Sequence, residues 1–312
     1  MIPKPPPRDG GLGFLFIPPF RVQGVSVAGE ATSIFVPELD VCFDMGECPR
    51  SALPAKFVAI SHGHMDHVGG LAYFCSQRHF QGMGEANIIC HEGMAPAIRK
   101  MMEGYIDLEQ QVTPYNLIPM APEQEYEIKN NIFVRMFETE HASPSSGYVV
   151  YERRSKLLEE YAGLPQEKLR ELKERGTEIT RVLKVPLVAY LGDTPPGPVM
   201  VRDDVRKAQI VICECTFVDD DHQDRARIGK HLHLSHIAEW LPVLECQKLV
   251  LVHVSRRSNI VEARKRLMRL VKREHADRVE FLMDHRRNKA LYERQAEDAA
   301  RMEAQRSAGA SA

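Results

Sequence analysis

The chain has 312 residues, of which 44% are hydrophobic, and carries a formal net charge of −2 at pH 7. A chain of this length can bury a sizeable core in one α/β domain. The near-neutral balance excludes binding of nucleic acid through overall positive charge, so phosphate contacts must come from clustered Lys and Arg. Without a signal-like start or a long apolar segment, we expect a cytoplasmic protein that does not contact membranes.

Cysteine usage fits this expectation. The seven cysteines are odd in number and lack the paired spacing of a disulfide framework, which predicts reduced thiols. Cys213 and Cys215 could act as soft metal ligands, but their place in an apolar run favours buried, inert side chains.

The first predicted elements are strands between Phe14 and Leu53, followed by the apolar run 57–61. Directly after this run stands His62-Gly63-His64-Met65-Asp66-His67. Neutral imidazoles and carboxylates are the ligands that hold Zn²⁺ at roughly 2.0–2.2 Å. His62 and His64 can reach one ion while Asp66 and His67 reach another, so the motif predicts a dinuclear metal site.

Three later strand-like runs each end close to one further potential ligand. These runs are short and rich in β-branched residues, as buried strands are. They are 132–137, which leads to His141, 187–191, which leads to Asp193, and 249–252, which leads to His253. Strands that deliver ligands to one sheet edge can build a single metal site.

The remaining elements are predicted helices. One covers Met94–Asp107, and residues 155–180 form an insert with charged i,i+4 patterning that predicts an exposed helical hairpin. Two more cover Leu234–Leu244 and Val261–Glu274. Residues 290–312 predict a polar tail, either a frayed helix or disordered, after one domain over 1–289.

From about Gly24 to Arg257 the chain resembles the metallo-β-lactamase superfamily and, within it, ribonuclease Z, the tRNA 3′-endonuclease. The superfamily signature His-x-His-x-Asp-His is matched by residues 62–67. Further matching segments are Asp44-Met45-Gly46, residues 144–148, Glu214-Cys215-Thr216-Phe217, Lys230-His231 and residues 253–257. Cys213 and Ser258 depart from the pattern, and no long Gly-Pro-rich arm of the kind that ribonuclease Z uses to grip the tRNA elbow is evident. The catalytic core is therefore better supported than the tRNA substrate.

The resemblance implies an αββα sandwich of the metallo-β-lactamase type, whereas periodicity alone indicates only an α/β protein. It also implies two Zn²⁺ ions. One is held by His62, His64 and His141, the other by Asp66, His67 and His253, and Asp193 bridges them. Mn²⁺ or Fe would also fit these ligands.

The implied reaction is hydrolysis of RNA, with precursor tRNA as the substrate, by a metal-bridging hydroxide that Asp66 orients. His231 would protonate the leaving 3′-oxygen, with Glu214 as its orienting carboxylate. His233 stays open as an alternative donor. Ser255 and Arg257 would contact the scissile phosphate, and a homodimer is expected.

Two other functions remain open from the sequence. A hydrolase of a small phosphodiester or ester would use the same dinuclear core without a tRNA grip. A non-catalytic RNA-binding subunit would show a decayed metal site, whereas every ligand is present here.

Overall fold

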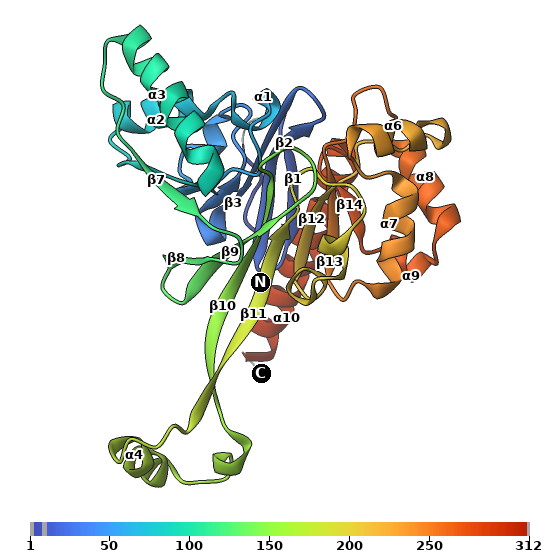
Figure 1. Ribbon diagram of the computed structural model, residues 1–312. Coiled ribbons are helices and arrows are strands. Elements are labelled where there is room, and N and C mark those ends of the chain that lie inside the picture. Colours follow the sequence, from blue (N-terminus) through green and yellow to red (C-terminus); the bar gives the residue numbers. More distant parts are fainter. Residues whose placement is uncertain (1–2, 8–10, 311–312) are drawn as a thin grey trace.

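Two seven-stranded β-sheets form the centre of the structure, a computed structural model that describes residues 3–7 and 11–310, the last four by backbone alone. The sheets pack face to face, and helices cover their outer surfaces (Figure 1). The predicted αββα sandwich is therefore confirmed.

The two sheets have the same topology. Each begins as an antiparallel meander and continues as parallel strands, the change occurring at β4 in the first sheet and at β11 in the second. The first sheet has the order β1(Gly13–Ile17), β2(Phe20–Val27), β3(Ala31–Val36), β4(Val41–Phe43), β5(Phe57–Ala59), β6(Ala86–His91), β7(Tyr115–Met120). The second has the order β14(Val279–Phe281), β13(Lys248–Val252), β12(Ile210–Glu214), β11(Thr180–Tyr190), β10(Ser146–Leu157), β9(Ile132–Glu138), β8(Glu125–Lys129).

Ten α-helices lie among the described residues, connected in part by short 3₁₀ turns. The α-helices are α1(Met65–Val68), α2(Leu71–Phe80), α3(Ala95–Glu109), α4(Gln166–Glu174), α5(Asp203–Arg206), α6(Gln223–Gly229), α7(Leu234–Trp240), α8(Ile260–Leu270), α9(Arg273–Ala276) and α10(His285–Ala310). The 3₁₀ turns are η1(Pro37–Leu39), η2(Arg50–Ala52), η3(Glu92–Met94), η4(Glu159–Tyr161), η5(Pro198–Val201), η6(Asp220–His222) and η7(Leu241–Val243).

Three hydrophobic cores fill the spaces between the layers. Successive side chains of a strand point to opposite faces, so Ile212 packs between the sheets while its neighbours Val211 and Cys213 pack against the helices of the second half. The first sheet repeats this arrangement, with Phe43 between the sheets and Cys42 in the core beneath α2 and α3. These strands are buried on both faces, which is why their sequences are continuous apolar runs.

The carboxyl ends of the ligand-bearing strands meet at one edge of the sandwich. β5 ends before His62, β9 before His141, β11 before Asp193 and β13 before His253. β11, β12 and β13 run parallel, and β9 runs in the same direction because two antiparallel pairings separate it from β11. The fold thus brings these loops together.

The insert 155–180 is not the predicted helical hairpin. β10 and β11 continue past the sheet as a two-stranded ribbon, paired from Tyr148↔Tyr190 to Leu157↔Thr180. At its tip lie η4 and the single helix α4, and the whole arm projects from the body (Figure 1). The expectation that the chain lacks a long arm is therefore wrong.

A cluster of charges fixes the base of this arm. The carboxylate of Glu125 on β8 accepts hydrogen bonds from Arg135, Arg153 and Lys184, the last two on the ribbon strands. The guanidinium of Arg153 also lies 3.6 Å from the centroid of the Phe133 ring. Because three cations share one carboxylate, the ribbon is tied to the outer strands of the second sheet.

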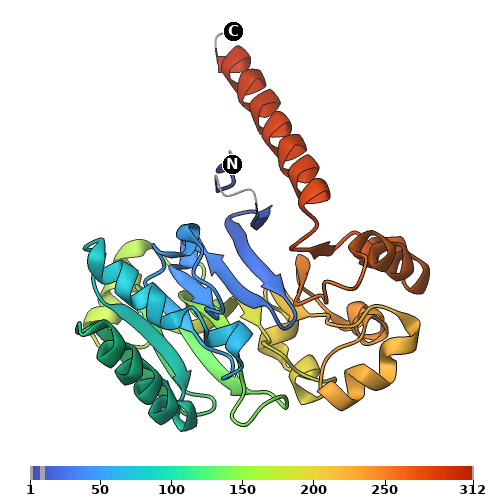
Figure 2. The ribbon, with the colours of Figure 1, turned by 90° about the horizontal axis from the view of Figure 1, so that it is seen from above.

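Of the two alternatives predicted for the C-terminal residues, the described ones form a helix, α10. The predicted boundary at residue 290 falls inside this helix, and Ser311 and Ala312 lie outside the described residues. Beyond the boundary, the Tyr292 ring packs edge-on against Phe14, and Gln295 donates to the carbonyl of Phe16. The helix is anchored on β1 and then projects from the body (Figure 2). None of the described helices is both long and apolar enough to span a bilayer.

Candidate metal centre

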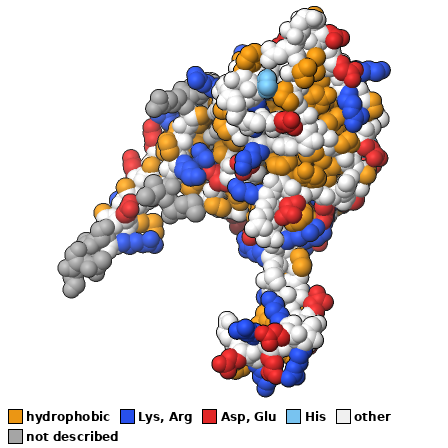
Figure 3. All heavy atoms as spheres, turned by 90° about the vertical axis from the view of Figure 1, so that its left-hand side faces the viewer, with side chains coloured by type: hydrophobic (Ala, Val, Ile, Leu, Met, Phe, Trp, Pro, Cys, Tyr) orange, Lys and Arg blue, Asp and Glu red, His pale blue; other side chains and the backbone are white. Residues whose placement is uncertain are grey.

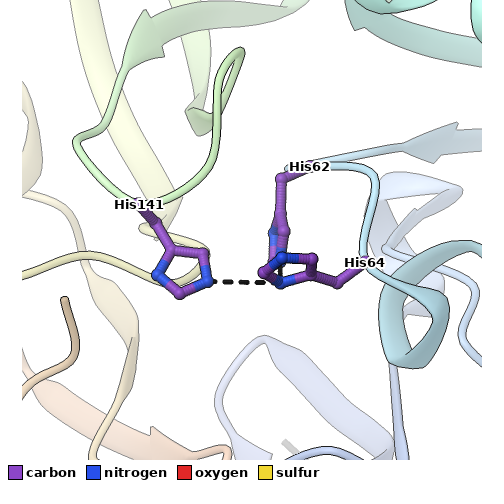
Figure 4. A group of neighbouring side chains, drawn as sticks. All are labelled: His62, His64 and His141. Carbon is purple, nitrogen blue, oxygen red and sulfur yellow. Dashed lines mark hydrogen bonds between the residues drawn. The ribbon is translucent and has the colours of Figure 1, made fainter. Parts of the chain in front are cut away.

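Five imidazoles and two carboxylates converge at the edge where the strand ends meet. His62 Nε2 lies 2.9 Å from His64 Nδ1, and His141 Nε2 lies 3.3 Å from the same atom. Figure 4 shows these three rings facing one another, two from the loop after β5 and one from the loop after β9. On the other side, His67 Nε2 lies 3.4 Å from His253 Nε2 and Asp66 Oδ2 lies 3.3 Å from it.

The side chains form several overlapping groups, which include the two sets that the resemblance implies and also His62 with His67 and Asp193. The ligand atoms of His62, His64 and His141 all lie within 4.8 Å of one another, and so do those of Asp66, His67 and His253. Asp193 lies between the two groups, since its Oδ2 is 3.4 Å from His67 Nε2 and from His253 Nε2, and 3.8 Å from His141 Nε2. A carboxylate in that position can serve both groups.

A buried carboxylate, Asp44, orients two of the imidazoles. Its oxygens accept from the Ser61 amide at 2.6 Å, the Ser61 hydroxyl at 2.7 Å, His67 Nδ1 at 2.8 Å and the Tyr190 hydroxyl at 2.5 Å. His67 therefore carries a proton on Nδ1, and its Nε2 faces the centre. Because Ser61 gives its proton to Asp44, its oxygen accepts from His62 Nδ1 at 3.0 Å, which frees His62 Nε2 in the same way.

A second buried carboxylate, Glu214, acts on the opposite half. The Thr216 hydroxyl donates to Glu214 Oε2 at 2.6 Å and so accepts from His253 Nδ1 at 2.9 Å. His141 Nδ1 donates to the Lys230 carbonyl at 3.1 Å. In each of these four imidazoles Nδ1 is hydrogen-bonded and Nε2 faces the centre, which is the nitrogen that can bind a metal when it carries no proton.

The charges of the group fit divalent cations. Burial, together with the neighbouring His67, lowers the pKa of His62 to about 3, so this imidazole is neutral. Burial favours the neutral form of Asp193, but the facing His253 and His67 hold the pKa of this carboxyl well below its usual value. Asp193 Oδ1 is buried without a hydrogen-bond partner in the described structure. The facing ring nitrogens and the unpaired buried oxygen of Asp193 form a donor set that fits divalent cations.

The two histidines at the proton-donor position have different surroundings. His231 Nδ1 bonds Glu214 Oε1 at 2.9 Å and lies 3.9 Å from Asp193 Oδ2, at the rim of the ligand group. His233 is buried, with Nδ1 accepting from the Ser235 amide at the start of α7 and Nε2 donating to the Asp219 carbonyl at 3.0 Å. Both nitrogens of His233 are committed to the fold, whereas the described hydrogen bonds of His231 involve Nδ1 alone.

The remaining predicted side chains lie in the loop after β13. Arg257 is exposed, and its amide donates weakly to the Ser255 hydroxyl, while the neighbouring Arg256 is paired with Glu30. Cys213 and Cys215 are free and fully buried, and burial raises the pKa of both thiols well above the usual value. They are absent from the described groups that could hold a metal.

Sequence reasoning missed the side chains that orient the ligands. Asp44 and Thr216 occur in segments that carry the family resemblance, and Ser61 directly precedes the signature, yet nothing local shows which imidazole each contacts. Asp44 follows strand β4 directly, so it obeys the same strand-end rule as the ligands. Tyr190 lies 146 residues from Asp44 in the chain, and its contact follows only from the packing of the two sheets.

The chain is similar to several known proteins. The beta-lactamase superfamily domain matches residues 42–163. The tRNase Z TRZ1 of Arabidopsis thaliana is 34% identical over 246 residues, which cover 78% of this chain and 88% of that protein. The chloroplastic tRNase Z TRZ2 of the same plant is 34% identical over 254 residues, covering 80% and 72% respectively. The chain belongs to the tRNase Z family.

The predicted resemblance is thereby confirmed. The crystal structure of the short form of human tRNase Z aligns with a TM-score of 0.54 and 20% identity, covering 79% of this chain and 93% of that one. At that identity the alignment supports the fold of this tRNase Z family member.

The role of Asp44 can be tested through metal affinity. We expect Asp44→Asn to weaken metal binding by about 10–100-fold, because the amide cannot accept from all four donors and His67 loses its fixed tautomer. Equilibrium competition with a fluorescent chelator measures this change. Asp40→Asn is the matched control, since Asp40 lies on the surface and pairs with Lys56 and Lys129. Equal affinities of the two variants would contradict the orienting role.

Proposed function

We propose that this protein is a metal-dependent endoribonuclease that removes the 3′ trailer from precursor tRNA. Its relatives at 34% identity are named tRNase Z. The observation that carries the proposal is the His231–Glu214 pair beside the ligand group. When a phosphodiester of RNA is hydrolysed, the leaving group is the 3′-oxygen of a sugar. This oxygen is a poor leaving group unless a nearby side chain gives it a proton.

The ligand group is proposed to hold two divalent ions, with zinc as the metal that its nitrogen and carboxylate donors favour. When bound, the ions would supply an activated water and neutralise charge on the phosphate. The Gly29 amide holds the Asp66 carboxylate in place by donating to Oδ2 at 2.8 Å. Contacts with His253 and His67 keep its pKa below the usual value although burial opposes this, so Asp66 stays an acceptor for the attacking water.

His231 is proposed to donate the proton to the leaving oxygen. Burial disfavours its charged form, but the hydrogen bond and charge of Glu214, with a further contribution from Asp193, raise the pKa of His231 above its usual value. Since Glu214 holds Nδ1, the proton on Nε2 is the one available for transfer. Glu214 is itself fixed by the Thr194 amide at 3.0 Å.

The arm is proposed to bind the tRNA body away from the cleavage centre. Lys and Arg alternate with Glu on its tip, where both charges are visible in Figure 3. Two of these pairs, Arg170–Glu174 and Arg175–Glu171, are the i,i+4 pairs expected from the sequence. The ribbon adds Arg154, Lys156 and Arg181, which are exposed. Phosphates of an RNA helix can be contacted along such a surface.

The absence of an arm would favour the alternative of a small phosphodiester or ester hydrolase. The structure has a projecting arm, so this alternative has no such support. A non-catalytic RNA-binding subunit does not explain why the ligands and the His231–Glu214 pair are all in place. The homodimer and the cytoplasmic location stay predictions.

The proton donor is tested by His231→Ala. We expect kcat on precursor tRNA to fall by on the order of 10²–10⁴, the range for loss of general acid catalysis. The loss should be small on bis(4-nitrophenyl) phosphate, whose leaving group needs no proton. Wild-type kcat on RNA should fall as pH rises through the raised pKa of His231, because the imidazole must be protonated, and the variant should lack this alkaline fall.

His233→Ala is the matched control for this experiment. It removes an N-terminal cap of α7, so we expect a loss of about 1 kcal/mol in the free energy of unfolding and little change in kcat. If His233→Ala were the inactive protein while His231→Ala cleaved RNA normally, the assignment would be wrong.

The arm is tested by replacing residues 158–179 with Asn-Gly, which connects the paired residues Leu157 and Thr180 by a two-residue turn. We expect precursor tRNA to bind on the order of tenfold more weakly and with a smaller salt dependence, since phosphate contacts are lost. Fluorescence anisotropy across a salt series measures both. Hydrolysis of bis(4-nitrophenyl) phosphate should be retained, and an equal loss of both activities would show that the tip only supports the fold.

A further inference from the structure

A cavity of about 440 Å³ opens beside the metal centre and shares two of its walls. One wall is the loop 138–145, which carries His141, and the other is the segment 194–199, which follows Asp193. Ser145 joins cavity and centre directly, because its hydroxyl accepts from the His141 amide at 3.2 Å. A group in this cavity therefore lies next to whatever reacts at the metal centre.

The chemistry of the cavity excludes a phosphate. Glu138 and Glu140 line it, and none of the described side chains around it is Lys or Arg. Anionic walls repel a phosphate group, whereas they accept hydrogen bonds from neutral N–H groups. Pro144, Pro195 and Val199 supply apolar surface of the kind on which a flat ring can pack.

A donor and an acceptor stand side by side in the cavity. His91 Nδ1 accepts from the Gly93 amide at 3.0 Å, so the proton of this imidazole is on Nε2. That Nε2 is buried, has no hydrogen-bond partner and lies 3.7 Å from Glu138 Oε1. A buried donor left unpaired is costly, which indicates that a ligand completes it.

We propose that this cavity binds the nucleobase on one side of the scissile phosphate, with Glu138 accepting from a base N–H and His91 donating to the adjacent acceptor. Each nucleobase carries a donor beside an acceptor on one edge, but their order and position relative to the sugar differ among the four bases, so a fixed Glu138–His91 pair fits some bases better than others. The volume is sufficient for a single base. The proposal rests on the RNA substrate proposed above. It makes Glu138 and His91 specificity-determining residues.

The test uses two series of precursor tRNA transcripts. One series varies the last nucleotide before the cleavage site through all four bases, and the other varies the first nucleotide after it. For wild-type enzyme, kcat/KM should differ by on the order of tenfold between the best and worst base in one series, which identifies the side that occupies the cavity.

Variants then connect this preference to the cavity. Glu138→Gln should change the order of the bases, because an amide donates as well as accepts. His91→Phe should reduce the difference between them by removing the donor while keeping a ring. Glu103→Gln, at an exposed position of α3 that does not line the cavity, is the matched control and should keep the wild-type order. Metal content and melting temperature check that each variant is folded.

Two outcomes would overturn the proposal. The first is a wild-type enzyme that cleaves all transcripts of both series at equal rates, and the second is an unchanged base preference in both cavity variants. Either result would mean that the cavity binds no base of the substrate. A wild-type enzyme that cleaves no precursor tRNA at all would instead contradict the proposed function.

Discussion

Two buried carboxylates, Asp44 and Glu214, determine the state of the metal centre. Asp44 accepts from Ser61 and His67 of the first half and from Tyr190 of the second, so it joins the two sheets where the ligands converge. Glu214 is held in the same way by Thr194 and Thr216. A buried carboxylate that lost these donors would be strongly destabilising, so each network permits one arrangement of side chains. The imidazole tautomers follow from that arrangement.

One continuous strand connects the metal centre with the arm. β10 starts at Ser146, whose amide donates to the Ser61 carbonyl at 2.8 Å, and continues to Leu157 in the ribbon. The Glu125 cluster fixes the point where the ribbon leaves the sheet. A substrate held by the arm would thus be presented to the centre by a fixed scaffold, which suits a reaction that depends on correct placement of one phosphate.

The convergence of the candidate ligands was predictable from the sequence because each group of them follows a short apolar strand, a signal that is local. The arm was not predictable because a two-stranded ribbon has water on both faces. Residues 153–156 and 181–184 therefore lack the alternation of a half-buried strand, while the i,i+4 charges of α4 dominate the pattern. The choice between His231 and His233 also needed the structure, since only the burial and partners of His233 show its role in the fold.

The most direct measurement is the metal content of the purified protein after metal repletion, determined by inductively coupled plasma mass spectrometry. Two groups of ligands joined by Asp193 predict about two equivalents per chain. Asp193→Ala should lower the content more than loss of any single imidazole, because its carboxylate faces both groups. One equivalent or less in the wild-type protein would contradict the account.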